Sequence, residues 1–576
     1  MGFSRQLRGI VEDAYLRAAQ AEGWPGDVPD FAVERPKDTK MGDYATNIAL
    51  QLARPLRRAP REIAERIARE VHAGEDFAAA EVAGAGFLNF RLTQAFHPRV
   101  LRALQDDSQG YLSSDIGRGE RILLEFVSAN PTGPLNVVSA RAAAIGDTLG
   151  RLLRLTGHDV FTEYYVNDAG SQVENLALSI LVRMQLPDGP REIPEDGYHG
   201  EYVTDLAKRF LSQAPASFSG MPREQQLSLL KAWAMAEMGR MRLATLEAYG
   251  VHFDNFFSEA AFRAGSGVDE LLATFARRGI LEGKEPGRRV VERAQHEEAT
   301  PLLEDRDGAR WLRTDLLGDD KDRVLVRSDG NYTYFLPDIG YHHGKYQRGY
   351  TRVIDLLGPD HHGYVARMRA AMEALGHAPE SFQVLIVQWV RFLRGGVPQN
   401  MSKRAGETVT IDELLSDVGR DAARYFFLMR SHDTPLDFDL QLAQEESSEN
   451  PVYYVQYAHA RIASIRRQAG GEASTGGLSS AGADFSLLTA PEEVEILRRL
   501  GQLPEEIEEA AKALEPHRIP RMATELAQAF HSFYNKNRVL GVDPPLSAAR
   551  LALAVAVGSA LRELLTLLGV DAPDRM

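Results

Sequence analysis

The short apolar run at residues 122–127, Ile-Leu-Leu-Glu-Phe-Val, restricts the possible folds of this chain more than any other feature. Such a run is typical of a strand buried inside a parallel sheet. A Pro/Gly turn follows it, and four apolar residues then recur at helical spacing: Ile145, Leu149, Leu152 and Leu153. Many α/β proteins begin a nucleotide-binding unit in this way, because the helix N-terminus presents N–H groups to phosphates. Further strands of the same sheet are predicted at residues 160–166, 353–357 and 384–387.

The composition limits what such a fold can do. The 576 residues, 44% of them hydrophobic, are enough for about three domains. The absence of cysteine excludes disulfides, thiolate metal sites and a thiol nucleophile. A net charge of -15 argues against nonspecific nucleic-acid binding by the whole surface, but not against an RNA held by local basic patches. No apolar stretch of about 18 residues and no signal-peptide core are apparent, so we expect a cytoplasmic protein without a membrane segment.

Changes of pattern along the chain predict its domains. Residues 1–110 open with an amphipathic helix and close on a strand-like alternation at 84–92. Residues 111–430 contain the parallel-sheet pattern, with a helical, polar insertion at about 186–250, and residues 431–576 are strongly helical. We therefore expect a multidomain α/β protein in which a Rossmann-like domain lies between an α/β N-terminal domain and an all-α C-terminal domain.

Residues 125–139 and 400–406, far apart in the chain, resemble the HIGH and KMSK signatures of class I aminoacyl-tRNA synthetases. Flanking residues narrow the resemblance to the arginyl-tRNA synthetases, and it spans nearly the whole chain in the right order. The resemblance implies ATP-dependent attachment of L-arginine to tRNA(Arg) through an arginyl-adenylate. The implied partners are tRNA(Arg), L-arginine and ATP, with Mg²⁺ carried by ATP as a substrate and no permanently bound cofactor. A monomer is expected.

Both signatures depart from the family pattern. Asn136 and Ser139 stand where the family carries two histidines, and Asn400 replaces the first lysine. An amide and a hydroxyl still donate hydrogen bonds to a developing phosphate charge, but they carry no charge of their own. Loss of one transition-state donor costs about 3 kcal/mol, and replacement is expected to cost less. Two interpretations stay open: an active enzyme with variant signatures, or a noncatalytic tRNA-binding or regulatory paralog. The flanking domains argue against a third, an adenylylating enzyme unrelated to tRNA.

The resemblance also implies the residues that handle ATP. Lys403 is expected to meet the pyrophosphate as it leaves, because positive charge on a mobile loop stabilises the departing phosphates. The predicted catalytic residues are Lys403, Asn136 and Ser139. The predicted ATP-binding residues are Gly133, Asn136, Ser139, His361, His362, Met401 and Lys403. Asp360 beside the two histidines also suggests a metal site, but no further ligand pair stands at metal-binding spacing, so none is expected.

Amino-acid selection is expected to depend on carboxylates, since planar, bidentate acceptors hold a guanidinium best. Tyr334 and Asp338 resemble the family's strand-to-helix turn that lines the side-chain pocket, and Glu259 resembles its second carboxylate. Glu125 and Asn130 match residues near the substrate's α-amino and carboxylate groups. The full predicted arginine-binding set is Glu125, Ser128, Asn130, Glu259, Tyr334, Asp338 and Asp360.

Contacts to tRNA are implied at both ends of the chain. Phe87 and Asn89 match the N-terminal domain strand that is expected to contact the tRNA D-loop. Tyr453, Tyr457 and Arg461 lie in a run of the helical domain that is typical of the arginyl enzymes, and exposed tyrosine beside arginine can stack on splayed-out bases. The alternative for each of these tyrosines is the aromatic core of a helix bundle.

Overall fold

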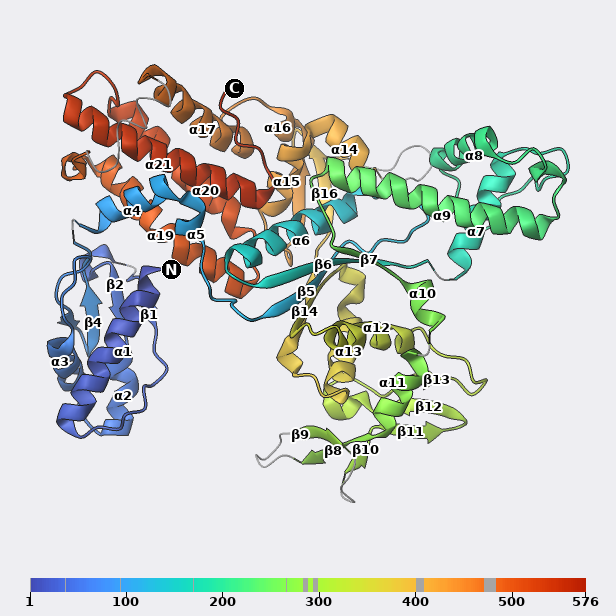
Figure 1. The fold of residues 1–576 in the computed structure, drawn as a ribbon, viewed down its shortest axis with the longest axis horizontal. Helices are drawn as coiled ribbons and strands as arrows, with labels where there is room; N and C mark the ends of the chain where they lie inside the picture. The colour runs from blue at the N-terminus through green and yellow to red at the C-terminus, as the bar shows by residue number, and fades with distance from the viewer. Residues whose placement is uncertain are drawn as a thin grey trace. The chain divides into compact units, whose positions relative to one another are not determined.

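The computed structural model describes residues 2–36, 38–93, 95–168, 170–265, 267–282, 289–293, 299–399, 409–470 and 483–576. The chain forms two compact units, whose elements Figure 1 labels. The sheet unit comprises residues 118–154 and 158–446. The terminal unit comprises residues 1–117, 155–157 and 447–576.

A five-stranded parallel sheet of order β15-β14-β5-β6-β7 lies at the centre of the sheet unit. Its strands are β5 (Arg121–Glu125), β6 (Asp159–Val166), β7 (Asn255–Ser258), β14 (Arg352–Leu357) and β15 (Phe382–Ile386). The four predicted strands are confirmed, each within about two residues of its predicted bounds. In β5 the side chains of Ile122, Leu123 and Leu124 are fully buried, as the continuous apolar run requires.

The order of the strands reverses beside β5. This strand comes first along the chain but lies in the middle, with β6 and β7 on one side and β14 and β15 on the other. In open α/β sheets, ligands bind outside the carboxyl ends of the strands at such a switch point. Glu125 on β5 and Asp355 on β14 are register partners there. The topology therefore predicts a site around these two carboxylates.

The helix α6 (Val137–Leu155) packs directly on the sheet because two of its residues lack side chains. A Cβ on Gly146 would lie 2.3 Å from the ring carbon Cγ of Phe126, and one on Gly150 would lie 3.6 Å from Leu124. The helix is fixed at its other face by Arg141, which is fully buried and donates to three backbone carbonyls. Burial lowers the pKa of Arg141 to about 10.

Three helices beyond β6 form a hydrophobic core of their own. They are α7 (Ser171–Arg183), α8 (Glu201–Gln213) and α9 (Arg223–Ala248), and the core includes Leu176, Val203 and Leu230. The helices α8 and α9 fall in the range where the sequence predicts a helical insertion.

The remaining elements of the sheet unit include three small three-stranded sheets, of orders β10-β8-β9, β11-β12-β13 and β17-β16-β18. These elements are η2 (Phe218–Gly220), α10 (Glu259–Arg263), α11 (Gly267–Ala276), β8 (Arg278–Glu282), β9 (Arg289–Arg293), β10 (Thr300–Pro301), β11 (Leu303–Arg306), β12 (Ala309–Leu312), η3 (Thr314–Leu317), β13 (Arg323–Val326), α12 (Phe335–Gln347), η4 (Pro359–His361), α13 (His362–Ala374), η5 (Pro379–Ser381), β16 (Val390–Arg394), β17 (Val397–Pro398), α14 (Ile411–Val418), α15 (Arg420–Leu428), β18 (Leu436–Asp439) and α16 (Leu440–Gln444).

The terminal unit begins with an antiparallel sheet of order β1-β2-β4-β3 and ends in long helices. The strand predicted at 84–92 is confirmed as β4. The elements are α1 (Phe3–Glu22), β1 (Val33–Glu34), η1 (Thr39–Met41), β2 (Tyr44–Thr46), α2 (Ile48–Leu56), α3 (Pro60–Glu70), β3 (Glu81–Ala83), β4 (Phe87–Phe90), α4 (Phe96–Asp106), α5 (Ser108–Leu112), α17 (Pro451–Gln468), η6 (Phe485–Leu487), α19 (Pro491–Ala513), α20 (Arg518–Lys536) and α21 (Pro544–Leu568). Together with the parallel sheet, these elements confirm the predicted multidomain α/β fold class.

The helix α21 is long and apolar enough to cross a membrane, with a mean hydropathy of 1.8 over its most apolar window. The expectation that the chain contains no such stretch is therefore wrong. The same window is 72% buried, and α21 packs against α17, α20 and α4. A Cβ on Gly558 would lie 2.9 Å from Ile462 of α17. The apolar composition thus matches the core helix of a bundle.

The close approach of α6 to β5 predicts that Gly146→Ala destabilises the protein by about 1–3 kcal/mol, because the new methyl group overlaps a buried ring. Gly239→Ala on α9 is the matched control, since a Cβ there meets nothing within 4 Å. It should be neutral or stabilise by about 0.5–1 kcal/mol. Urea-unfolding midpoints measure both changes, and equal stability of the two variants would contradict the predicted packing.

Candidate active site

The turn that follows β5 has a strained backbone. Val127 and Ser128 have φ angles of +71° and +40°, left-handed values that are rare outside glycine and especially rare for a β-branched residue. The Ser128 N–H donates to the Phe126 carbonyl at 3.0 Å. The Ser128 hydroxyl donates to Glu125 Oε1 at 2.8 Å and accepts the Tyr165 N–H at 3.1 Å, which ties the turn to β6. Strain of this kind is concentrated at ligand sites.

Two side chains from α8 and α9 anchor the next part of this turn. Arg242 donates to the carbonyl of Gly133 at 2.8 Å and 3.1 Å and to that of Ala129 at 3.1 Å. The Tyr202 hydroxyl donates to the carbonyl of Thr132 at 2.9 Å. The sequence analysis missed both anchors, because no local pattern marks a side chain that acts across such a separation.

Asn136 caps the helix α6. Its Oδ1 accepts the N–H groups of Val138 and Ser139, both at 3.1 Å, and the Ser139 hydroxyl lies 3.4 Å away. This is the geometry of an N-cap residue, a position at which asparagine is among the most favourable residues. Because the cap uses the oxygen, the donor of this side chain is its amide nitrogen. The sequence predicts Asn136 as a donor but does not predict this capping role.

The segment that follows the second signature pairs with the first signature. Val137 N–H donates to the Val409 carbonyl at 3.0 Å, and Ile411 N–H donates to the Leu135 carbonyl at 2.9 Å. The two bonds flank an antiparallel bridge, and α14 begins directly after it. The chain therefore returns from the second signature onto the first. The whole second signature, residues 400–406, lies outside the described residues, and with it the predicted Asn400, Met401 and Lys403.

A network of buried charges joins the carboxyl ends of β5 and β14. Lys345 Nζ on α12 donates to Glu125 Oε2 at 2.6 Å and to Asp355 Oδ1 at 2.8 Å. The exposed fractions of the three side chains are 0%, 8% and 1%. Buried charges are tolerated when they are paired and hydrogen-bonded. Lys345 is thus the cation that allows two carboxylates to lie together at the switch point.

Tyr341 and Arg348, also from α12 and its C-terminus, extend this network to β6. The Tyr341 hydroxyl lies 2.8 Å from Glu125 Oε2 and 2.9 Å from Glu163 Oε1. Arg348 donates to both oxygens of Glu163 at 2.6 Å and 2.8 Å. Although burial raises the pKa of Glu163, the bonds from Arg348 outweigh it and lower that pKa. One helix therefore bonds the acidic side chains of three adjacent strands.

Among the described residues, Glu125, His342 and Asp355 form a group whose ligand atoms lie within 4.8 Å of one another, as at a metal site. Lys345 already bonds both carboxylates, and His342 Nε2 lies 2.7 Å from Asp355 Oδ2. The protein itself thus supplies the positive charge that this group of ligands requires.

His342 connects this network to Asp338. Its Nδ1 lies 2.8 Å from the Asp338 carbonyl oxygen and 3.4 Å from the Asp338 Oδ1. Burial and the neighbouring Lys345 lower the pKa of His342, but Asp355 and Asp338 outweigh them and raise it to about 9. The side chain is therefore an imidazolium at neutral pH, with both nitrogens acting as donors.

Three carboxylates of the predicted arginine-binding set converge on Tyr165. Glu125 ends β5, Glu259 begins α10 and is 6% exposed, and Asp338 lies in the first turn of α12. Burial raises the pKa of the Tyr165 hydroxyl, and the charges of Glu259, Asp338 and Glu125 raise it further.

The start of α10 is fixed by the turn after β6. Asp168 Oδ1 accepts the Ala260 N–H at 2.8 Å, and its Oδ2 accepts the Ser258 hydroxyl at 2.6 Å. The Ser258 hydroxyl also accepts an N–H of α10 as its N-cap. Glu259 lies between these two anchored residues, so its position in the site is set by the backbone.

Other residues of the predicted site occupy more accessible positions. Tyr334 precedes α12 and is 80% exposed. Asn130 is exposed in the turn after β5. Asp360, His361 and His362 follow β14 in η4 and at the start of α13, and all three are exposed. These residues are exposed, whereas the side chains of Glu125, Lys345 and Asp355 are buried.

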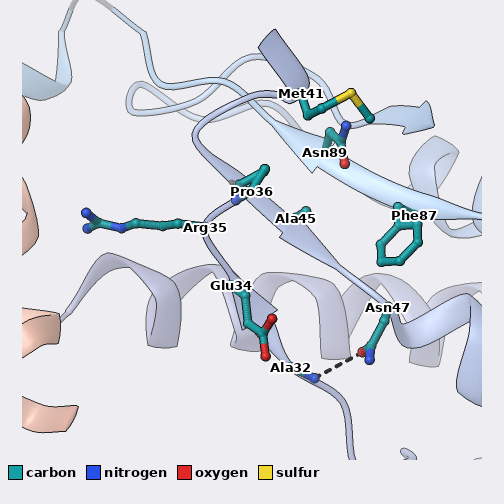
Figure 2. A pocket seen from close by; sticks show the side chains of 9 residues that line it. All are labelled: Ala32, Glu34, Arg35, Pro36, Met41, Ala45, Asn47, Phe87 and Asn89. Carbon is teal, nitrogen blue, oxygen red and sulfur yellow. Dashed lines mark hydrogen bonds between the residues drawn. The ribbon is translucent and has the colours of Figure 1, made fainter. Parts of the chain in front are cut away.

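In the terminal unit, Phe87 and Asn89 line one cavity of about 350 Å³ together with Met41 and Asn47. Figure 2 shows Asn47 accepting a hydrogen bond from the backbone at the rim, and Arg35 extending away from the other lining side chains. Phe87 is 41% exposed and Asn89 is buried. The cavity therefore combines an accessible aromatic ring with amide groups.

The helices α17 and α20 carry a stack of aromatic residues. The rings of Tyr453 and Tyr457 are parallel with centroids 6.2 Å apart, and Tyr457 stacks on His531 at 6.0 Å. The Arg461 guanidinium lies 4.8 Å from the ring centroids of both Tyr457 and Tyr534. The two tyrosines on α17 are half-buried. Part of each ring is therefore accessible to solvent, and the rest packs in the helix bundle.

The fold and the charged site at the sheet's switch point define the catalytic domain of a class I aminoacyl-tRNA synthetase. Residues 288–462 match the family described as tRNA synthetases class I (R), catalytic domain. Residues 5–92 match the arginyl tRNA synthetase N terminal domain, and residues 455–576 match the DALR anticodon binding domain.

Full-length relatives identify the family within this class. The arginine–tRNA ligase of Symbiobacterium thermophilum is 47% identical over 573 residues, which cover 99% of this chain and 98% of the relative. That of Shouchella clausii is 44% identical over 574 residues, with 99% and 98% covered. The chain therefore belongs to the arginyl-tRNA synthetases, as the signatures predict: it is a class I arginine–tRNA ligase, with arginine, tRNA(Arg) and ATP as substrates.

A solved arginyl-tRNA synthetase from Thermus thermophilus shares the fold. It superposes with a TM-score of 0.72 at 24% identity, and the match covers 99% of this chain and 100% of that one.

The imidazolium of His342 predicts a pH-dependent stability. A raised pKa in the folded protein stabilises it fully below the unfolded value of about 6.5, and this contribution is lost as the pH rises through about 9. Because His342→Gln keeps hydrogen bonding without the charge, its stability relative to the parent should improve by up to about 3 kcal/mol between pH 6 and pH 10. Urea unfolding at both pH values measures the difference, and a constant difference would contradict the assigned charge.

Proposed function

We propose that this chain attaches L-arginine to tRNA(Arg) through an arginyl-adenylate, and that its two signatures still support this reaction despite their substitutions. A carboxylate oxygen of arginine attacks the α-phosphorus of ATP, and pyrophosphate leaves. The terminal 2'-hydroxyl of tRNA then attacks the carbonyl carbon, and AMP leaves. The pairing of residues 409–411 with residues 135–137 supports this proposal most directly, because it brings the residues that follow the second signature against the first. No protein nucleophile is required, so positioning and electrostatics supply the rate.

For arginine, we assign the guanidinium to Glu259 and Asp338, with Tyr334 beside them. The basis is their place at the carboxyl ends of the strands: Glu259 directly follows β7, and Asp338 is joined through His342 to Asp355 of β14. The α-amino and carboxylate groups are assigned to the remaining predicted residues, Glu125, Ser128, Asn130 and Asp360. In this arrangement, acceptors of opposite charge meet both cationic ends of the substrate.

For ATP, we assign Gly133, Asn136, Ser139, His361, His362, Met401 and Lys403, with Lys403, Asn136 and Ser139 acting in catalysis. The Asn136 amide nitrogen is suited to phosphate oxygens, because Oδ1 of the same side chain already accepts the N–H groups that begin α6 and the nitrogen remains a donor. Lys403 supplies a positive charge for the pyrophosphate. Mg²⁺ enters with ATP, bound by phosphate oxygens as is usual for this ion.

For tRNA, we assign Phe87 and Asn89 to one unstacked base and Tyr453, Tyr457 and Arg461 to the anticodon region. The cavity beside Phe87 supports the first assignment, because it offers a ring for stacking and amides for hydrogen bonds (Figure 2). The parallel rings of Tyr453 and Tyr457 support the second.

The domains proposed for these tasks are residues 1–110 for tRNA binding, 111–430 for catalysis with an insertion at about 186–250, and 431–576 for the anticodon. We further propose that the protein acts as a monomer in the cytoplasm. The arginine-binding carboxylates favour an enzyme over a noncatalytic paralog, since a pure tRNA binder has no use for an arginine pocket.

The assigned pocket predicts that Glu259→Gln and Asp338→Asn each lower kcat/KM for arginine about a hundredfold or more, because a buried charge without its partner costs about 3–5 kcal/mol. Aminoacylation kinetics measure this, and citrulline should compete poorly with arginine in the parent enzyme. The control is Asp437→Asn, which breaks an exposed pair with Arg391 and should leave the kinetics unchanged. Normal charging by both pocket variants would place the pocket elsewhere.

The altered first signature predicts that ATP–pyrophosphate exchange, measured with tRNA present, falls in an Asn136→Ala/Ser139→Ala double variant while tRNA binding is kept. Alanine also removes the cap of α6, at a cost of about 1 kcal/mol. Asn136→Asp separates the two effects, because aspartate caps a helix equally well but donates no hydrogen bond. It should fold as stably as the parent and exchange poorly.

Full exchange by the double variant would show that neither side chain contributes to activation. No exchange by the parent protein, combined with tight tRNA binding in a filter assay, would favour the noncatalytic paralog.

A further inference from the structure

A guanidinium of the protein itself occupies the proposed arginine side-chain pocket. Arg263, the last residue of α10, forms an ion pair with Glu259 one helical turn earlier. Its guanidinium carbon also lies 5.8 Å from the centroid of the Tyr334 ring. Glu259 and Tyr334 are two of the residues assigned above to the guanidinium of the substrate. An arginine side chain is thus held where the proposed function places the side chain of free arginine.

The two side chains of this ion pair differ in how exposed they are and in how firmly their backbone is held. The Glu259 side chain is 8% exposed, and the residues on both sides of it are bonded to Asp168. The Arg263 side chain is 37% exposed and ends a five-residue helix. A long side chain that borders solvent can rotate into water and keep its charge hydrated. The Arg263 side chain can therefore move away from the pocket into solvent, whereas Glu259 is held in place by its anchored neighbours.

A buried carboxylate requires a counter-charge whether or not substrate is bound. Arg263 supplies that charge to Glu259 in the empty site. An incoming guanidinium needs both oxygens of the carboxylate for a bidentate pair, and a second cation beside it is repelled. The substrate and Arg263 therefore compete for Glu259.

We infer that Arg263 is a built-in competitor for the arginine side-chain pocket: it neutralises Glu259 when the site is empty and is displaced when the guanidinium of the substrate binds. This inference rests on the proposed function of Glu259. It makes Arg263 a residue that sets the affinity for arginine without contacting the reacting atoms. Ligands that carry a guanidinium must displace it, whereas ligands that bind only at the α-amino and carboxylate end need not.

The test is calorimetric titration of the full chain with three ligands. Arg263→Gln should lower the Kd of arginine about two- to fivefold, the range expected when a partly exposed ion pair no longer competes. Agmatine, which has the guanidinium but no carboxylate, should bind more tightly by the same factor. Norvaline, which has the amino-acid end without the guanidinium, should bind the variant and the parent equally. Arg61→Gln, which breaks an exposed i,i+4 pair with Glu65, is the matched control and should change none of the three.

Weaker arginine binding by Arg263→Gln would overturn the inference, because Arg263 would then hold the substrate rather than compete with it. Unchanged binding of arginine and agmatine would overturn it as well. If Arg263→Gln fails to fold, Arg263→Lys replaces it. Its single ammonium pairs less well than the guanidinium fork and should give a smaller tightening in the same direction, so unchanged or weaker binding by this variant overturns the inference too.

Glu259→Gln separates this inference from the function on which it rests. Normal arginine binding by Glu259→Gln would remove Glu259 from the pocket, and both proposals would fail. Weakened binding by Glu259→Gln, together with no tightening in Arg263→Gln, would overturn only the competition.

Discussion

The pairing of Lys345 with Glu125 and Asp355 is the interaction on which the architecture of the site depends. Two carboxylates on adjacent parallel strands repel each other, and neither is solvated. A single ammonium group from α12 removes this repulsion and fixes the helix over the strands. The same helix carries Asp338 in its first turn. The contact of Lys345 with Glu125 and Asp355 therefore also fixes the position of Asp338, a proposed substrate-binding carboxylate on the same helix.

The parallel sheet could be predicted from sequence because each strand is a local signal, a short apolar run between polar turns. Glu125, Glu259 and Asp338 could be proposed as substrate-binding residues because their flanking residues resemble a known family. Lys345 and His342 could not, although they carry a weak signal. With Asp338 and Tyr341 they recur at i, i+3, i+4 and i+7 along α12, which places all four on one helix face. Polar residues at that spacing usually indicate a helix face that is exposed to solvent. This face is instead buried, because it bonds the acidic side chains of the strands beneath it.

Other features have no local signal at all. Arg242 and Tyr202 anchor the turn after β5 from distant helices. The helix α21 shows the opposite case, in which a strong sequence signal is open to two interpretations, a membrane helix and a core helix. Its apolarity is plain in the sequence, yet the bundle around it determines what that apolarity means. Asn136 lies between these cases, since its substitution is visible in the sequence and its role as a helix cap is not.

The pairing of residues 135–137 with residues 409–411 also has a consequence for biosynthesis. A contact between segments so far apart cannot form on a ribosome until nearly the whole catalytic portion has emerged. Closing so long a loop is entropically unfavourable. The hydrogen bonds of the contact offset this cost only after both segments have been synthesised. An incomplete nascent chain thus contains residues 135–137 without residues 409–411, so this pairing forms in a late step of folding.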